Sequence, residues 1–397
     1  MPSHKIGQGY VHLTELEKRY VNQALDSNRI SAGPFMEKFE TQFAARHGCK
    51  HAIMLNSGTS ALHVSVAALK ELGGWKNGDE VLVPASTFIA SSNVILHNNL
   101  TPVFVDIDPR TYNLNPDEIE RHLTQRTRAV MPVHMYGQPC DMDRILDIAR
   151  RHKLKVLEDS CECMFTRFRN QWVGSMGDLG CFSTYVAHIL TTGVGGLITT
   201  NNDSYAIACR SIMAHGRDHI YLKIDDDDCM EDPERRRAVV AGRFNFIWLG
   251  HSFRSTELEA ALGLGQLTIA DQIMAARRRN AAAITQRLSP LSKWLQLPET
   301  APNREHAFMM YPIVCKEGVR RDELVDHLEE KIETRPMMPV LGQPIYRKIF
   351  GETLEDKYPV AKWVTRNGFY IPCHHGLSNE DIETIGQTMD AFFQRNS

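Results

Sequence analysis

Three groups of residues could bind a ligand or act in catalysis, and each follows a short apolar run. Asn56-Ser-Gly-Thr-Ser60 opens a helical pattern, so its backbone N–H groups and hydroxyls form a potential anion site. Asp159 ends another run, where a buried carboxylate costs several kcal/mol unless it meets a cation such as a pyridinium nitrogen. His188 lies in Phe182-Ser-Thr-Tyr-Val-Ala-His-Ile-Leu-Thr-Thr-Gly-Val-Gly-Gly196, and an imidazole is a base near neutral pH.

Each of these residues also has an ordinary structural interpretation. Ser57 or Thr59 can be a plain helix N-cap, and Asp159 can be a carboxylate at a helix start. Phe88, after a further apolar run, can stack on a flat heteroaromatic ring or pack in the core. His188 can be a structural histidine. Residue types alone leave these alternatives open.

Short apolar runs alternate with helical patterns from His51 to Leu157. This alternation predicts an α/β fold with a mostly parallel sheet covered by helices. Ligands of such sheets bind at the carboxyl ends of the strands. The polar residues of interest fall at those ends, among them Asp106, His134 and Asp159.

A long helical pattern from Glu257 to Leu288 follows the alternating part of the chain. We therefore predict a large α/β domain with an N-terminal arm over residues 1–255 and a connecting helix over 256–289. A smaller α+β domain is expected over 290–397. The hydrophilic segment 223–237 is expected to be a surface loop.

Composition excludes several classes of protein. The 397 residues are 43% hydrophobic and carry a net charge of −3 with both signs mixed, which indicates neither nucleic acid nor a membrane surface as partner. No apolar run approaches the roughly 20 residues of a membrane span, and the first residues resemble no signal peptide. We predict a soluble cytoplasmic protein. The nine cysteines lack framework spacing and are expected to be reduced thiols, with no metal site.

Motifs run in order through nearly the whole chain. They are Ile30-Ser-Ala-Gly-Pro-Phe35, Asn56-Ser-Gly-Thr-Ser-Ala-Leu62, Asp79-Glu-Val-Leu-Val-Pro84, Phe104-Val-Asp-Ile-Asp108, Pro132-Val-His-Met-Tyr-Gly-Gln-Pro139, Leu157-Glu-Asp159, Ala214-His-Gly216, Gly250-His-Ser-Phe-Arg254 and Arg335-Pro336. In these motifs the chain resembles the DegT/DnrJ/StrS family of fold-type I pyridoxal-phosphate enzymes (aspartate-aminotransferase-like), which act on nucleotide-linked keto sugars.

The resemblance implies roles for individual residues. Phe88 would stack on the cofactor ring, Asp159 would pair with the pyridine nitrogen, and Glu162 would lie near the ring hydroxyl, where most aminotransferases of the family have glutamine. The cofactor phosphate would be held by Ser57, Gly58, Thr59 and Ser183.

The family is usually a homodimer with shared active sites, in which the segment matching Gly250–Arg254 sends an asparagine to the partner's phosphate. This chain has Ser252 there, and we expect the serine to take that place. For the sugar or its phosphates we expect contacts from His215, His306 and Arg335, since arginine suits bidentate phosphate binding.

His188 is the main departure from the family pattern. The aminotransferases of the family have lysine at this point, and no lysine lies between Lys155 and Lys223. A branch of the family carries histidine there: the 3-dehydratases, which remove the C3 hydroxyl of a 4-keto-6-deoxy sugar nucleotide. Imidazole does not form the covalent link to the cofactor that lysine forms. Pyridoxal phosphate, or more usefully pyridoxamine phosphate, is therefore expected to bind non-covalently.

The sequence thus predicts a 3-dehydratase that acts on a nucleotide-linked keto sugar. His188 would remove a proton from the cofactor carbon, the C3 hydroxyl would leave, and glutamate would restore the amine form. The alternatives are an aminotransferase of the same family with a histidine base, or a non-catalytic protein that binds the cofactor or a nucleotide sugar.

Overall fold

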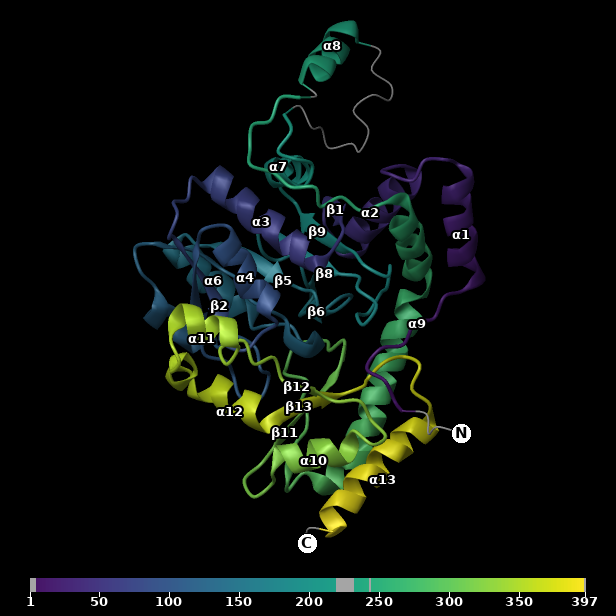
Figure 1. The fold of residues 1–397 in the computed structure, drawn as a ribbon, viewed down its shortest axis with the longest axis vertical. Helices are drawn as coiled ribbons and strands as arrows, with labels where there is room; N and C mark the ends of the chain where they lie inside the picture. Colours follow the sequence, from purple (N-terminus) through teal and green to yellow (C-terminus); the bar gives the residue numbers. More distant parts are fainter. Residues whose placement is uncertain (1–4, 219–231, 243, 396–397) are drawn as a thin grey trace.

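The computed structural model describes residues 5–218, 232–242 and 244–395 (Figure 1). A seven-stranded sheet in the order β1-β9-β8-β5-β4-β2-β3 forms its centre. All neighbouring strands pair in parallel except β9, which is antiparallel to both β1 and β8. The prediction of a mostly parallel sheet is confirmed. The strands are β1 His51–Leu55, β2 Glu80–Pro84, β3 Thr101–Val105, β4 Thr127–Val130, β5 Lys155–Asp159, β8 Leu179–Ser183 and β9 Gly196–Thr200.

Both faces of this sheet are buried, because alternate residues of one strand point to opposite faces. Val81 and Val83 of β2 belong to one apolar core, whereas Leu82 between them belongs to another. The core of Val81 and Val83 is covered by α3 (Gly58–Gly73), α4 (Ile89–His97) and α7 (Asp203–Met213). The core of Leu82, on the opposite face, is covered by α6 (Met142–His152). Runs such as Glu80–Pro84 are therefore buried throughout, as their composition predicts.

Helix α9, Glu257–Leu288, runs from the top of the large sheet to the bottom of the molecule (Figure 1). Thr256 begins it with a capping box closed by Glu259. The carboxylate of Glu257 accepts hydrogen bonds from the backbone N–H groups of Phe35 and Met36 at 2.9 and 2.8 Å. These bonds fix the start of α2 (Pro34–Arg46) against α9, next to α1 (Glu15–Asp26).

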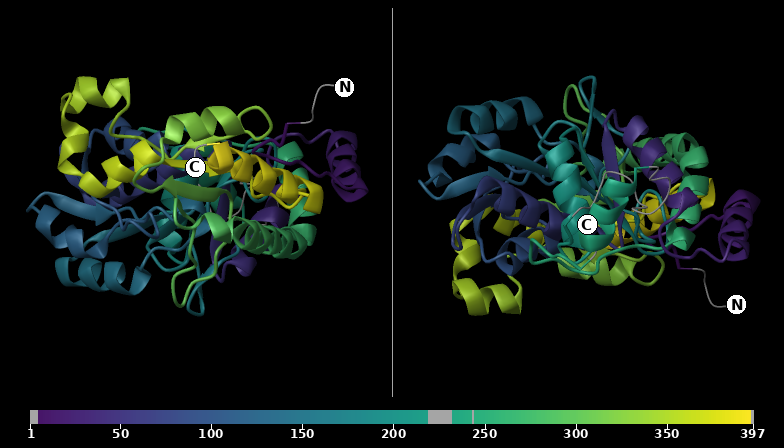
Figure 2. Two further views of the ribbon diagram at one scale, coloured as in Figure 1. Left: turned by 90° about the horizontal axis from the view of Figure 1, so that it is seen from below. Right: turned by 90° about the horizontal axis from the view of Figure 1, so that it is seen from above.

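A second, four-stranded sheet in the order β10-β11-β13-β12 follows α9. Its strands are β10 Leu295–Gln296, β11 Tyr311–Cys315, β12 Arg335–Pro336 and β13 Gly368–Ile371. Seen from below, the segments after α9 lie in front of the large sheet (Figure 2). With α10 (Arg321–Leu328) and α13 (Asn379–Arg395), this sheet buries a core that also takes in Ile6 of the N-terminal arm.

The helices α11 (Pro344–Phe350) and α12 (Pro359–Asn367) pack instead against the core of the large sheet, through Tyr346 and Val364 among others. Asp106 at the end of β3 accepts the first N–H groups of α12 at 3.0 and 2.8 Å, so this strand-end carboxylate is a helix cap. We keep as a proposal the division into a large domain up to residue 255, a connecting helix up to 289 and a small domain after it. Helices α11 and α12 of the proposed small domain contact the large domain.

The predicted surface loop 223–237 is described only from residue 232, and its earlier part lies outside the described residues. From Pro233 to Gly242 the chain forms α8 rather than a loop, and α8 projects from the body beyond α7 (Figure 1). The remaining elements are α5 Pro116–Ile119, β6 Arg167–Phe168 and β7 Gln171–Trp172, with four short 3-10 helices among the described residues. None of the helices described here is long and apolar enough to cross a membrane.

Candidate active site

His188 lies in the loop between β8 and β9, and its side chain is half-buried. Its Nδ1 is 2.6 Å from the carbonyl oxygen of Cys161. A carbonyl only accepts hydrogen bonds, so Nδ1 carries the proton and donates. The lone pair therefore lies on Nε2, which is the atom that can take a proton from a substrate or cofactor.

Burial lowers the pKa of His188 to about 4. The positive charge of Arg277 also lowers this pKa, whereas the hydrogen bond to Cys161 raises it. The imidazole is therefore neutral at physiological pH. The sequence suggests an ordinary histidine pKa, whereas burial in the structure makes the imidazole a weaker base that is in its proton-accepting form at neutral pH.

Asp159 ends β5 and is only 4% exposed. Its Oδ2 accepts a hydrogen bond from the Ser91 hydroxyl at 2.7 Å, and its Oδ1 accepts one from the backbone N–H of Cys161 at 3.2 Å. No lysine, arginine or histidine in the described residues forms an ion pair with it. Burial raises the pKa of this carboxyl group above its usual range. A cation that bound here would be stabilised by the charge and would restore the ionised form.

Cys161 connects the two groups. Its N–H binds Asp159 and its carbonyl binds His188, so one peptide segment sets both the carboxylate and the imidazole. Both of these contacts are made by main-chain atoms of Cys161. Its side-chain thiol is buried, which raises the pKa of the thiol far above its ordinary value.

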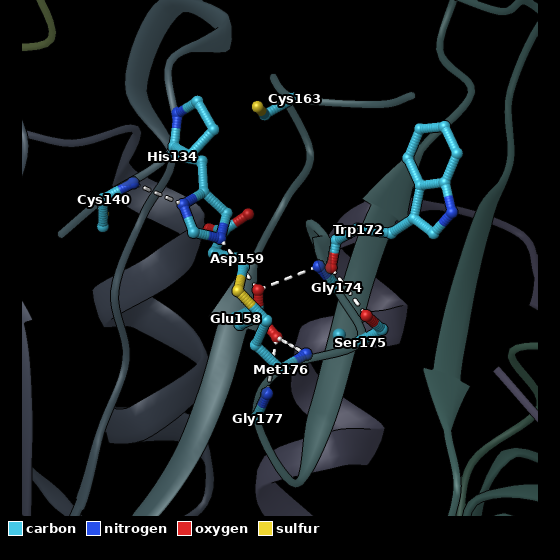
Figure 3. Close-up of polar contacts among 12 residues, drawn as sticks. His134, Cys140, Glu158, Asp159, Cys163, Trp172, Gly174, Ser175, Met176 and Gly177 are labelled. Carbon is cyan, nitrogen blue, oxygen red and sulfur yellow. Dashed lines mark hydrogen bonds and ion pairs between the residues drawn. The ribbon is translucent and has the colours of Figure 1, made fainter. Parts of the chain in front are cut away.

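A second buried carboxylate holds the strand that carries Asp159 (Figure 3). Glu158 accepts three backbone N–H bonds, from Gly174, Met176 and Gly177, at 2.8, 2.7 and 2.6 Å. It also lies 3.1 Å from Nε2 of His134, whose Nδ1 accepts the N–H of Cys140 at 3.0 Å. The imidazole therefore donates through Nε2 to Glu158. This network ties β5 to the turn that leads into β8, and hence to the loop of His188.

The predicted phosphate residues converge at the start of α3. Ser57 is its N-cap and accepts the N–H of Ser60 at 3.0 Å, as the plain capping interpretation expects. A Cβ atom placed on Gly58 would lie 2.8 Å from Cβ of Ser183 and 2.9 Å from Sγ of Cys161. Only glycine fits there. Thr59, on the first turn, is exposed beside the free N–H groups of the helix, where an anion is favoured.

Phe88 precedes α4 and is 57% exposed, so it is not the core residue of the alternative interpretation. It lies one turn before Ser91, which binds Asp159. Glu162 is buried and accepts the N–H of Tyr136 at 2.7 Å. Burial and, to a smaller extent, the nearby Asp159 raise the pKa of Glu162 to about 7.

None of the remaining predicted residues has a described hydrogen bond to His188 or Asp159, although Phe253, next to Ser252, accepts the backbone N–H of Asn56 at 2.9 Å. Ser252 accepts a hydrogen bond from Arg254 at 2.9 Å, and Nε2 of the exposed His215 lies 3.4 Å from the same guanidinium. His306 is buried, stacks on Phe308 at 3.8 Å between ring centroids, and accepts that residue's N–H at 2.9 Å.

Arg335 is exposed on β12, paired with Glu333, opposite Tyr370 of β13. The Tyr370 ring lies 6.0 Å from that of Tyr136, the residue that donates to Glu162. Arg335 is linked to the cluster through these successive contacts, and His306 is linked to it through Phe308, whose carbonyl accepts a hydrogen bond from Arg277, which also binds the His188 carbonyl.

The family model described as the DegT/DnrJ/EryC1/StrS aminotransferase family matches residues 11–390. The chain belongs to this family. It is 38% identical to the GDP-perosamine synthase of Caulobacter vibrioides over 94% of each chain. It is 31% identical to a dTDP-4-dehydro-2,6-dideoxy-D-glucose 3-dehydratase of Saccharopolyspora spinosa, over 93% of this chain and 82% of the relative.

Solved structures of the same family superpose closely. The GDP-4-keto-6-deoxy-D-mannose-3-dehydratase of E coli with bound hydrated PLP has a TM-score of 0.88 at 27% identity, over 98% of this chain and 100% of that one. A GDP-4-keto-6-deoxymannose-3-dehydratase with a trapped PLP-glutamate geminal diamine has a TM-score of 0.86, also at 27% identity, over 97% and 100%. The fold-type I assignment and the pyridoxal-phosphate dependence of the family are confirmed.

The residues of this DegT/DnrJ/EryC1/StrS chain fit such a cofactor. Asp159 is a buried carboxylate that forms no ion pair with any residue of the described ranges, Gly58 leaves a cradle that a Cβ would fill, and Phe88 presents an open aromatic face. When bound, the cofactor supplies an electron sink that stabilises negative charge on the neighbouring carbon.

Sequence reasoning missed three supports of the site: Ser91, Glu158 and Arg277. Glu158 adjoins Asp159, and two successive carboxylates at the end of an apolar strand are a signal, because they must face opposite sides of the sheet. Ser91 and Arg277 leave no such signal, since only folding brings them to the site. Two buried cysteine thiols have hydroxyl partners: Cys163 contacts Thr166, and Cys181 contacts Ser65. Across the described residues, no three metal-ligating side chains converge.

Proposed function

We propose that this protein is a pyridoxamine-phosphate-dependent 3-dehydratase that acts on a nucleotide-linked 4-keto-6-deoxy sugar. The observation that carries the proposal is His188. In a chain of this family it stands where a lysine is expected, its Nδ1 is committed to Cys161, and its Nε2 is free to act. A neutral imidazole accepts a proton but provides no amine to tether an aldehyde, so the cofactor is held by non-covalent contacts alone.

Each residue of the cluster has a task in this reaction. The start of α3 and Ser183 would hold the cofactor phosphate, and the carboxylate of Asp159 would keep a bound ring nitrogen protonated through a charge-assisted hydrogen bond. His188 takes a proton at Nε2. Once protonated, its imidazolium is an acid with a low pKa, because burial and Arg277 both disfavour the charge. It therefore returns the proton readily, and the departing C3 hydroxyl is a suitable acceptor.

Glu162 fits the dehydratase branch of the family, because most aminotransferases of the family have glutamine at this position. A carboxyl group whose pKa is raised to about 7 is half-protonated near neutral pH, so it can donate a hydrogen bond to an oxygen as well as accept one. Hydrolysis of the dehydrated product then releases a 3-deoxy ketone and ammonia. Glutamate restores the amine, in keeping with the PLP-glutamate adduct in the related 3-dehydratase.

A second candidate is a sugar aminotransferase with a histidine base. The 38% identity to a GDP-perosamine synthase favours it, because that relative is closer in sequence than the 3-dehydratase of Saccharopolyspora spinosa at 31%. The same residues would bind the cofactor and a GDP- or dTDP-linked sugar. The two candidates differ in whether the nitrogen leaves as ammonia or stays on the sugar.

We also propose that the enzyme is a cytoplasmic homodimer with shared sites. All eight cysteines in the described part of the chain are free, which suits a reducing compartment. Large apolar side chains are exposed around the site and on the segment after α8, for example Phe88, Tyr185, Phe244 and Leu249. In the proposed dimer a second copy would cover these side chains.

The test is incubation of the protein with pyridoxal phosphate, glutamate and a panel of GDP- and dTDP-linked 4-keto-6-deoxy sugars. If the protein is a dehydratase, mass spectrometry should detect a sugar product that is lighter than the substrate by one oxygen atom. Free ammonia should form in an amount equal to that of this product. A stable amino sugar without ammonia would establish the aminotransferase instead. His188→Asn is the control, because asparagine keeps a polar group but accepts no proton at neutral pH.

A further inference from the structure

Arg277, on the middle of α9, has the largest fully buried side chain among the described residues, at 2% exposure. Among the residues that the structure describes, its guanidinium binds only backbone carbonyls. Nη1 donates to Phe308, Met309 and Cys373 at 3.2, 2.9 and 2.8 Å, and Nη2 donates to the carbonyl of His188 at 3.4 Å. It therefore joins α9, the segment before β11, the end of β13 and the catalytic loop.

This cation has no carboxylate partner in the described part of the chain. Another buried arginine, Arg210, shows the usual arrangement, with Glu40 at 2.7 Å. A buried charge without a counter-ion is costly, and removal of a single partner usually destabilises such a site strongly. Arg277 still carries its proton at neutral pH, because burial lowers its pKa only to about 10. An unpaired charge beside His188 needs a reason other than stability.

We propose that Arg277 is a positioning residue for His188: it holds the loop at the His188 carbonyl, and its charge adds to the effect of burial in disfavouring the imidazolium. The inference rests on the proposed role of His188 as the base.

The groups that face His188 come from three elements. Cys161, after β5, offers a carbonyl that accepts the Nδ1 proton. Tyr185, in the same loop, places its ring edge-on at 6.3 Å between centroids. Arg277 of α9 is the charged group that acts on the imidazole, and its charge opposes protonation. Without it, burial alone would disfavour the imidazolium, and the Cys161 carbonyl would partly offset that effect.

Nuclear magnetic resonance of cofactor-free protein labelled with nitrogen-15 histidine tests this inference. His188→Gln assigns the resonance. Arg277→Met removes the charge, and the titration midpoint of His188 should rise by about one pH unit. The acid limb of the kcat profile should move by the same amount. Arg278→Met is the matched control: Arg278 is the next residue of α9, it binds the carbonyl of His306, and its charge lowers the pKa of His306 rather than that of His188.

Arg277→Lys separates charge from geometry. An ammonium group keeps the positive charge, so the midpoint should stay in place, but it lacks the planar fork that reaches four carbonyls. We expect kcat to fall at least about tenfold with KM unchanged.

The proposal is overturned if the His188 midpoint is the same in folded Arg277→Met as in the wild type. If Arg277→Met does not fold, a wild-type kcat in Arg277→Lys overturns it. A midpoint that moves in a protein that releases no ammonia from keto sugars refutes the dehydratase and leaves the role of Arg277 intact.

Discussion

Asp159→Asn should stabilise the cofactor-free protein and weaken its binding of the cofactor. In the structure Asp159 is a buried carboxylate whose partners are a hydroxyl and one N–H group, and burial raises its pKa. An asparagine can keep both contacts. Its oxygen accepts from Cys161, and its amide donates to Ser91, whose hydroxyl can turn to Thr87 at 2.9 Å. The substitution removes the charge and keeps both existing contacts, and the second N–H of the amide is the one new donor that it introduces.

The two effects have opposite signs and can be estimated separately. Without cofactor, loss of an uncompensated buried charge should raise the free energy of unfolding at pH 8 by about 1 kcal/mol. With cofactor, loss of a charge-assisted hydrogen bond of about 1.5–3 kcal/mol should raise the Kd about 10- to 150-fold. A general destabilisation of the fold would instead lower the free energy of unfolding and the cofactor affinity together.

Urea unfolding of the cofactor-free protein and fluorescence titration with pyridoxal phosphate measure these effects. Ser91→Ala is the control, since it removes a hydroxyl from the same carboxylate and keeps the charge. It should lower stability and leave the Kd within a few-fold. An Asp159→Asn variant with wild-type affinity and full turnover would refute the assignment of Asp159 to the ring nitrogen.

His188→Lys places an amine at the loop position, so borohydride should leave the cofactor covalently attached to the variant and not to the wild type, as seen by mass spectrometry; attachment in the wild type would contradict the account. The pKa of Glu162 is about 7 in the folded protein and about 4.5 in the unfolded chain. Between these two pH values the native protein binds more protons than the unfolded chain, so its stability falls as the pH rises from about 4.5 to about 7. Glu162→Gln should remove this slope and be more stable than the wild type at pH 8 by up to about 3 kcal/mol in urea unfolding, and parallel pH profiles would refute it. Gly58→Ala should reduce cofactor affinity at least about tenfold by calorimetry, because its Cβ would meet Ser183 and Cys161; an unchanged Kd would show that the cradle lies elsewhere.

Much of the large sheet follows from local patterns. The runs His51–Leu55 and Glu80–Pro84 have the same bounds as β1 and β2, since apolar β-branched stretches between turn residues form buried strands. The direction of β9 does not follow. Its sequence is that of a strand, but its antiparallel pairing depends on the sharp return of the loop that carries His188. The helix at Pro233–Gly242 was also not predicted, because its charged composition is that of a surface loop.

Some residues of the candidate site could likewise be predicted from local sequence, and others could not. Asp159, Gly58 and Thr59 stand at strand ends and helix starts, where local sequence already places them together. Arg277 lies 89 positions from His188 and was read only as part of a long helix. His306 shows the converse: a polar residue in a loop suggests a ligand, while stacking on Phe308 two residues away buries it. Contacts that depend on distant segments require the structure.

The destination of one nitrogen atom tests the central claim most directly. The protein is loaded with nitrogen-15 pyridoxamine phosphate and mixed with a nucleotide-linked 4-keto-6-deoxy sugar, without glutamate, for a single turnover. Dehydration with His188 as base predicts the label in free ammonia and a 3-deoxy keto product, neither of which forms with His188→Asn. Label found in an amino sugar that keeps its C3 hydroxyl would contradict the account.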